Sequence, residues 1–389
     1  MSPSTAMKKT KLLNAKEKLR YYLRFCCGNK NSSKVLILSS TGNSHGLSFP
    51  FHFYRRELAS KFNFHFEEFI SNSLDDKLNR IKTFDGDIIF VSMPLRIDGE
   101  ILSRQQVLTF FQSIDSSRRF KLVFFDISDN AISPYFDILP YVDLFLMPFV
   151  FRDQHNYAKP FKGGNIMSDY LADRFQMAAT VENGFHDGLF LSHPAAEQIH
   201  KIMPSWNWML WRSMIKAFKG QNYRCILNGH RTIDVTCRFT QYEGWCRFHR
   251  LAVCERLAAL SPRYAIVATK DKVDLKSYYQ ELESSRISFS PFGYGEICPK
   301  DFEAMIKGCL LFKPSVEHLN TYPQIHIANE TYVPVAWDLA DLEEKISYYL
   351  ERPEEQRRIT ANAAKAYEKF FAESGFLTKI GEILQQLQG

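Results

Sequence analysis

The chain has 389 residues, which is more than one ordinary hydrophobic core holds and suits two domains. Hydrophobic residues make up 45% of it, and no run of 18 apolar residues predicts a transmembrane helix. The net charge is +6, but residues 1–30 alone carry eight bases and one acid, a charge of +7. The main body is therefore close to neutral, which argues against nucleic acid as a partner.

The eight cysteines form no Cys-x-x-Cys pair and lie mostly in apolar runs, so we expect reduced thiols in a cytoplasmic protein. The first eleven residues lack the apolar core of a signal peptide.

Residues 10–27 have the pattern of an amphipathic helix, with apolar residues on one side and lysines and arginines on the other. The basic stretch 8–27 suits a peripheral site on an anionic membrane surface, at the inner face of the membrane. The alternative is a terminal helix that is docked on the protein, with its charges in water. A polar linker ends this segment at residue 33.

Strand patterns alternate with helical patterns over 34–202, which predicts a parallel sheet covered on both faces, as in a Rossmann-like domain. We expect its strands at 34–40, 64–69, 87–93, 121–126 and 143–147. A glycine loop over 41–46 follows the first strand, but its spacing is not that of a dinucleotide-binding fingerprint.

Asp126 and Asp129 come directly after one of these strands. Ligands of doubly wound sheets bind outside the carboxyl ends of the strands, so either carboxylate is a candidate to accept a proton from a hydroxyl group. The alternative is that Asp129 or Ser128 caps the next helix.

Residues 203–222 form the expected crossing between domains, and three of the five tryptophans lie within six positions of it. This density suits a membrane interface, but we favour a segment packed between two domains.

Alternation of strands and helices resumes over 223–355, with strands expected at 231–238, 264–269, 287–290, 309–312 and 332–335. Helices over 356–389 end the chain. Arg250 and Lys270, with Arg247 as a substitute, follow successive strands, so we expect them to converge and hold a pyrophosphate.

The most informative stretch is 287–315, which predicts a strand, a glycine turn, a helix that begins at Pro299, and another strand. Gly293 and Gly295 let the backbone approach a ligand closely, and the free amides up to Ile297 favour an anion. Glu303, one turn into the helix, suits a pair of sugar hydroxyls. The alternative is a structural turn with a solvated Glu303.

This stretch resembles the donor-binding segment of GT-B glycosyltransferases of the "group 1", retaining, family-4-like type found in bacterial polysaccharide gene clusters. The matching residues are Gly295, Glu296, Glu303, Ala304, Met305 and Gly308. The family has seven residues between its two glutamates, whereas six lie between Glu296 and Glu303.

The resemblance implies an α/β protein with the GT-B fold: two Rossmann-like domains, with parallel sheets facing a cleft, and a C-terminal helix that crosses back. It implies that Glu303 binds the ribose, that Glu296 is a candidate catalytic residue near the donor sugar, and that Arg250 and Lys270 hold the donor phosphates.

The resemblance also places candidates on the acceptor side. The first loop of the fold faces the cleft, which makes His45 a candidate catalytic residue, although a lone histidine is more often structural. The loop with Asp153, His155 and Lys159 resembles an acceptor-side loop, and its alternative is a solvated loop.

The implied function is transfer of a sugar from a nucleotide-diphospho donor to a glycan or lipid-linked acceptor in surface polysaccharide synthesis. The nucleotide sugar is a co-substrate, and neither a cofactor nor a metal is expected. Two alternatives remain open: a nucleotide-sugar epimerase on the same fold, and a degenerate glycosyltransferase that acts as a scaffold or binding protein.

Overall fold

The computed structural model describes residues 33–41, 43–94, 96–97, 99–176, 193–220, 229–240 and 244–388, without the side chains of 43–47. The predicted basic helix over 8–27 lies outside the described residues.

The N-terminal domain (residues 33–204) is built on a six-stranded sheet in the order β2-β1-β3-β6-β7-β9, in which all neighbours are parallel. Val35 to Leu38 in the central strand β1 are all buried, as expected for a sheet covered on both faces. The strands are β1 (Ser33–Ser39), β2 (Phe64–Ile70), β3 (Ile88–Ser92), β6 (Lys121–Phe125), β7 (Leu144–Met147) and β9 (Ile202–Pro204). Its helices are α2 (Asn43–Phe53), α3 (Arg55–Phe62), α4 (Leu74–Lys82), α5 (Arg104–Gln112) and α6 (Ile166–Arg174), and a short hairpin joins β4 (Arg96–Ile97) to β5 (Glu100–Ile101).

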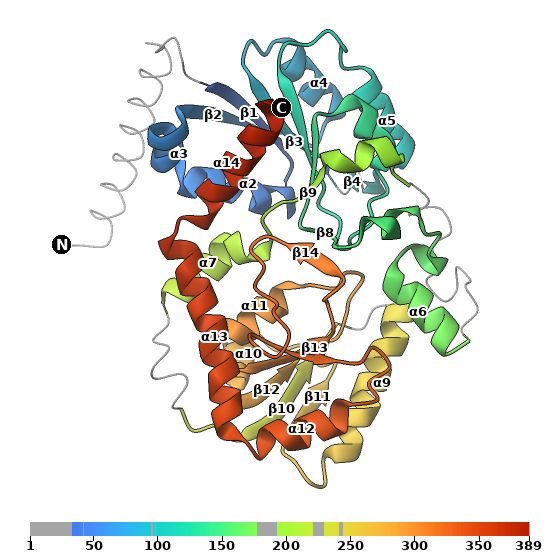
Figure 1. The fold of residues 1–389 in the computed structure, drawn as a ribbon, viewed down its shortest axis with the longest axis vertical. Coiled ribbons are helices and arrows are strands. Elements are labelled where there is room, and N and C mark those ends of the chain that lie inside the picture. The colour runs from blue at the N-terminus through green and yellow to red at the C-terminus, as the bar shows by residue number, and fades with distance from the viewer. Residues whose placement is uncertain are drawn as a thin grey trace, which may run out of the picture.

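The C-terminal domain (residues 229–372) has a five-stranded parallel sheet in the order β11-β10-β12-β13-β15. The strands are β10 (Ile233–Arg238), β11 (Ile266–Thr269), β12 (Ser285–Phe289), β13 (Leu310–Pro314) and β15 (Val333–Val335). The helices are α9 (Gly244–Leu260), α10 (Leu275–Ser284), α11 (Pro299–Ile306), α12 (Leu342–Leu350) and α13 (Pro353–Ala372). The expected pair of Rossmann-like domains is therefore confirmed (Figure 1).

Two segments connect the domains. The tryptophan-rich segment holds a 3-10 turn at Trp208–Leu210 and helix α7 (Arg212–Lys219), and both contact α11 of the C-terminal domain. The last helix, α14 (Gly375–Gln388), returns to the N-terminal domain and packs against α3 (Figure 1). Both the domain-interface interpretation of the tryptophans and the returning helix are confirmed.

The aromatic ring of Phe376 is at the centre of this return. It is fully buried, and its ring lies 4.9 Å from Trp206, 5.3 Å from Tyr54 and 5.4 Å from Phe51. The contacts with Trp206 and Phe51 are edge-to-face and that with Tyr54 is stacked, and such ring pairs add to the stabilisation from burial alone. One residue of the last helix thus joins α2 to the crossing segment.

A separate two-stranded sheet also joins the two domains directly. Strand β8 (Phe149–Phe151) of the N-terminal domain pairs antiparallel with β14 (Leu319–Thr321) of the C-terminal domain. Neither segment was among the strands expected from the sequence. The ladder lies at the middle of the molecule, between the two large sheets (Figure 1).

One local prediction differs from the structure. The expected glycine loop over 41–46 is shorter, because α2 already begins at Asn43 and includes Gly46. The helix places His45 in its first turn, but the His45 side chain is outside the described residues.

We expect Phe376→Ala to lower the free energy of unfolding by about 3–5 kcal/mol, because it leaves a cavity among packed rings. Denaturant unfolding measures the change. Ile101→Ala is the control, since Ile101 is 49% exposed, and it should change stability by no more than about 0.5 kcal/mol. Equal effects of the two substitutions would contradict the role of Phe376.

Candidate donor site and domain interface

The glycine turn lies where β12 ends and α11 begins, at the carboxyl edge of the C-terminal sheet. The Gly293 amide donates to the Gly295 carbonyl over 3.1 Å, which tightens the turn. A Cβ atom on Gly295 would lie only 1.5 Å from the backbone carbonyl oxygen of Asp129. Gly295 is therefore required by the close approach of the N-terminal domain.

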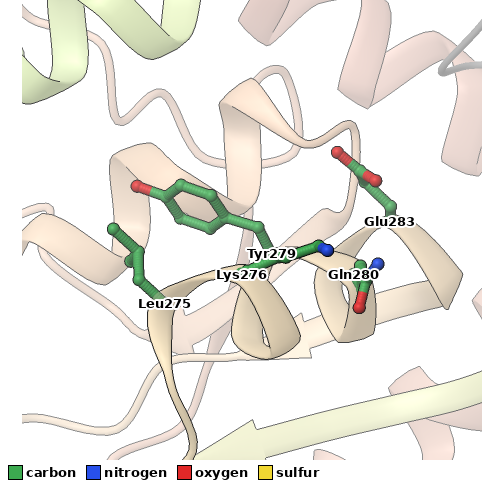
Figure 2. A pocket seen from close by; sticks show the side chains of 5 residues that line it. All are labelled: Leu275, Lys276, Tyr279, Gln280 and Glu283. Atoms are coloured by element: carbon green, nitrogen blue, oxygen red, sulfur yellow. The ribbon is translucent and has the colours of Figure 1, made fainter.

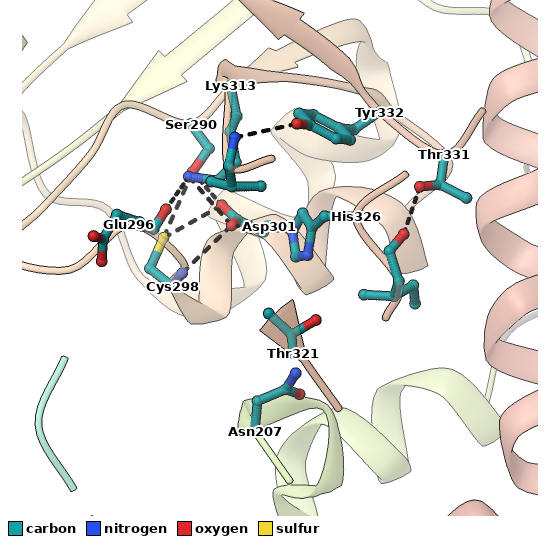
Figure 3. A network of polar contacts seen from close by, with 12 residues as sticks. Asn207, Ser290, Glu296, Cys298, Asp301, Lys313, Thr321, His326, Thr331 and Tyr332 are labelled. Atoms are coloured by element: carbon teal, nitrogen blue, oxygen red, sulfur yellow. Dashed lines mark hydrogen bonds and ion pairs between the residues drawn. The ribbon is translucent and has the colours of Figure 1, made fainter. Parts of the chain in front are cut away.

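A buried polar network packs beside the turn and supports it (Figure 3). Its centre is the Asp301 carboxylate, which is completely buried. It accepts a hydrogen bond from the Ser290 hydroxyl over 2.5 Å and lies 3.4 Å from the Lys313 ammonium and 3.3 Å from Nε2 of His326. Burial by itself would raise the pKa of Asp301, but Lys313, His326 and Ser290 outweigh it and hold the pKa below its usual range.

Lys313 extends this network to the turn itself. Its side chain is completely buried, its ammonium donates to the backbone carbonyl of Glu296, and it lies 4.8 Å from the centre of the Phe292 ring. The lysine therefore contacts the turn at two points.

The predicted phosphate-binding cations lie in different surroundings. Arg250 is buried on α9 and donates from Nε to the Phe292 carbonyl over 2.8 Å, and it also contacts the Thr240 carbonyl. It therefore positions the turn by direct contact. Arg247 is exposed on the same helix, and Lys270 is exposed just after β11, two strands from β12 in the sheet. Their roles in phosphate binding stay predictions.

Lys300, in the first turn of α11, was missed by sequence analysis and lies close to the turn. Its ammonium is near enough to interact electrostatically with Arg250 and with Glu303. Burial lowers the pKa of Lys300, and the Arg250 charge acts in the same direction. With Arg250 and Lys313, the turn thus has three cations beside it.

Glu303 lies one turn into α11, as expected, and is partly buried. The Tyr279 hydroxyl of α10 donates to its Oε1 over 3.3 Å. Burial raises the pKa of Glu303, while the hydrogen bonds of Tyr279 and Tyr278 oppose that rise.

Tyr279 also borders an open cavity of about 470 Å³ on the outer side of α10 (Figure 2). The lining residues are Leu275, Lys276, Tyr279, Gln280 and Glu283. All five residues belong to α10 and four of them are exposed, so this space is an open depression on the surface of the helix.

The two aspartates after β6 differ in role. Asp126 is buried, and its Oδ1 accepts from the amide and the hydroxyl of Ser128, a local turn that holds the loop. Burial raises the pKa of Asp126. Asp129 keeps solvent access, but the surrounding protein removes part of its hydration. Together with the charges of Asp126 and Glu296 this raises the pKa of Asp129 to about 6.

Glu296 lies at the domain interface. It is 3% exposed, its Oε1 is 3.5 Å from Nε2 of His318, and its Oε2 is buried with no hydrogen-bond partner within the part of the chain that the structure describes. Its charge raises the pKa of both Asp129 and Tyr157, which belong to the other domain. The structure therefore brings together Glu296 and Asp129, two of the predicted catalytic residues.

The predicted acceptor residues lie apart on an exposed 3-10 turn after β8. Asp153 caps this turn through the His155 amide over 3.0 Å, and Lys159 donates to the Asn156 side chain over 2.8 Å. Hydrogen bonds to His155 hold the pKa of Asp153 below its usual range. No contact of these three side chains with the glycine turn occurs among the described residues.

Sequence analysis missed most of the supporting residues. Asp301 lies two positions before Glu303, and Lys313 follows the apolar run Leu310–Phe312, so a charge next to a buried strand was the available signal. His318 and His326 had no such signal, because only the fold brings them to the turn.

The described residues contain neither a membrane-spanning helix nor a metal-binding cluster. No helix in the ranges given above is long and apolar enough to span a membrane. Nor do three or more His, Cys, Asp or Glu side chains of those ranges gather where they could hold a metal ion.

Comparisons with known proteins give one family match and several similar solved structures. Residues 215–384 match the family model described as "Glycosyl transferase-like". No curated protein matches the chain. Solved structures that are similar include a glycosyltransferase from Rickettsia africae, with 12% identity and a TM-score of 0.47 over 92% of this chain and 99% of that chain. Sucrose-phosphate synthase from Thermosynechococcus elongatus has 13% identity and a TM-score of 0.46 over 91% and 99%. An alpha-glucosyltransferase in complex with UDP and DNA has 9% identity and a TM-score of 0.47 over 92% and 100%.

The family match covers the C-terminal domain, which carries the glycine turn and Glu303. The two parallel sheets and the returning α14 complete the arrangement expected of the GT-B fold. Within residues 215–384 the chain is thus similar to the "Glycosyl transferase-like" family, and its architecture is the one expected of the GT-B fold.

We expect Lys313→Met to lower the free energy of unfolding by about 3–5 kcal/mol, because it leaves the buried Asp301 without its cation. Adding Asp301→Asn should recover part of that loss, since the unpaired charge is then gone. Denaturant unfolding of the two single variants and the double variant measures this coupling.

Lys345→Met is the matched control. Lys345 pairs with Asp341 over 2.6 Å in the same domain, but both side chains are 30% exposed, so we expect a loss of no more than about 1 kcal/mol. Strictly additive losses at 313 and 301 would refute the coupling.

Proposed function

We propose that the chain transfers a sugar from a nucleotide-diphospho donor to a glycan or lipid-linked acceptor, with a role in surface polysaccharide synthesis. The observation that carries the proposal is the glycine turn that opens α11, with Glu303 one turn further on beside an open cavity. Backbone amides at a helix start favour phosphate, and a carboxylate next to them favours hydroxyl groups.

The donor then has a defined direction in the site. Its diphosphate binds the glycine turn from Gly293 to Ile297, where Arg250 holds the turn and Lys300 adds positive charge. Its ribose binds Glu303. The Tyr279 side of the cavity takes the base, since an aromatic ring and a leucine offer an apolar surface to it. These groups neutralise the leaving diphosphate without a metal ion.

The acceptor binds from the N-terminal domain. Asp129 is the candidate base for the acceptor hydroxyl. Its backbone approaches Gly295 closely, and its carboxylate interacts electrostatically with Glu296. His45, Asp126, Asp153, His155 and Lys159 remain candidates for acceptor contacts or catalysis.

A nucleotide-sugar epimerase is the second candidate function. One observation favours it: the carboxylates of Asp129 and Glu296, from opposite domains, are close enough to interact electrostatically. Incubation of the protein with a nucleotide sugar and no acceptor separates the two: an epimerised sugar supports the second function, and transfer that requires an added glycan supports the first.

We expect Glu303→Gln to weaken nucleotide binding by about 1.5–3 kcal/mol, roughly tenfold or more, because a charged hydrogen-bond acceptor for the ribose is lost. Calorimetry with UDP, GDP, CMP and TDP, each in EDTA and in magnesium, measures the affinity. Glu330→Gln, an exposed residue outside the site, is the control. Unchanged affinity of Glu303→Gln would refute the ribose assignment, and binding or transfer that needs magnesium would refute metal independence.

We expect kcat/KM to rise with pH up to about 6 and then level off, because Asp129 must be ionised to accept a proton and its pKa is about 6. Asp129→Asn should abolish the rise together with most of the activity. Asp115→Asn, at an exposed turn, should leave the profile intact. A rising limb that survives Asp129→Asn would exclude Asp129 as the base.

A further inference from the structure

The contact between His318 and Glu296 lies where the two domains meet. Glu296 belongs to the glycine turn, and His318 belongs to the loop that leads from β13 into β14. Their side-chain atoms Oε1 and Nε2 are 3.5 Å apart, and the Glu296 side chain points away from the Asp301 network (Figure 3). Neither the family resemblance nor the proposed donor contacts give His318 a role.

The His318 ring is held in place by both domains. It packs edge-on against Trp337, with ring centres 5.2 Å apart, and lies 6.3 Å from the ring of Phe151. The Trp337 indole is itself fixed, because its N–H donates to the Ser315 carbonyl over 2.8 Å. The His318 backbone carbonyl accepts from the Arg152 amide over 2.9 Å, which continues the β8–β14 ladder. Pairing of the domains therefore sets the position of the histidine.

The Glu296 carboxylate receives no hydrogen bond from His318: Nε2 of His318 lies 3.5 Å from Oε1 and has no hydrogen-bond partner within the described residues. Lys313 holds its backbone carbonyl, His318 lies at Oε1, and the buried Oε2 has no hydrogen-bond partner within the described residues. A buried carboxylate oxygen without a partner costs free energy unless a ligand satisfies it. Asp129 and Tyr157 stand on the N-terminal side of the same carboxylate.

We infer that His318 is a positioning residue: it aims the free oxygen of Glu296 at a hydroxyl of the donor sugar, and it does so only when β8 and β14 are paired. The inference rests on the proposed function and on the expected place of Glu296 near the donor sugar, and it adds to them a role for His318. It also assigns a use to the ladder between the domains, because the ladder completes the sugar site.

The test compares His318→Phe, which keeps a ring against Trp337 but removes the N–H group, with His318→Gln, which restores an N–H donor. Glu296→Gln and the double variant with His318→Phe complete a cycle. Glu317→Gln is the control, since this neighbouring carboxylate is exposed and accepts a hydrogen bond from the Ser315 hydroxyl. Calorimetry gives affinities for UDP, UDP-glucose, UDP-N-acetylglucosamine, GDP and GDP-mannose.

We expect His318→Phe to leave nucleotide affinity within twofold of wild type and to reduce the affinity for the best-bound nucleotide sugar at least tenfold. His318→Gln should recover part of the loss, and the double variant should lose little more than Glu296→Gln alone. An undiminished affinity for the sugar nucleotide in His318→Phe, additive losses in the cycle, or equal wild-type affinity for nucleotides with and without the sugar would overturn the inference alone. Failure of the wild-type protein to bind any of the five probes would overturn the proposed function as well.

Discussion

The buried contact between Asp301 and Lys313 is the interaction on which the candidate site depends. Both side chains are completely removed from water, so each is tolerated only because the other is present. Lys313 comes from β13 and Asp301 from α11, and the lysine also holds the Glu296 carbonyl. One ion pair thus ties a strand, a helix and the glycine turn between them. The turn is rigid for an electrostatic reason, while its glycines only make its path possible.

The second constraint is the close approach of the two domains. The Asp129 carbonyl leaves no room for a side chain on Gly295, β8 pairs with β14, and Phe376 packs on Trp206. These contacts are of three different kinds, namely steric, hydrogen-bonded and aromatic, and they lie in different parts of the interface. Together they set which side chains of the two domains face each other, and Glu296 meets Asp129 and His318 as a result. Chemistry that needs groups from both domains is therefore conditional on this packing.

The charges around the turn are divided between its two sides. Arg250 and Lys300 lie on the side of α9 and α11, where a diphosphate would bind, and Asp129 and Glu296 lie toward the N-terminal domain. Cations on one side stabilise a leaving diphosphate, and carboxylates on the other stabilise positive charge that develops on a sugar. Burial is the main reason that the pKa of Asp129 is raised and the pKa of Lys300 is lowered, and a neighbouring charge of the same sign shifts each pKa further in that direction.

The sequence by itself determined the parts of this protein that depend on local pattern. Apolar runs separated by helical periods predicted both parallel sheets. Pro299, Gly293 and Gly295 predicted the turn and the start of α11. Both features depend on residues that are neighbours in the sequence. Only the tertiary structure decided the partners of the turn. Asp129 reaches it from far away in the chain, and Lys313 and His318 come from a later strand and loop that only folding brings beside it. The short strands β8 and β14 have too few residues for a periodic signal and exist only because each pairs with the other across the domain interface.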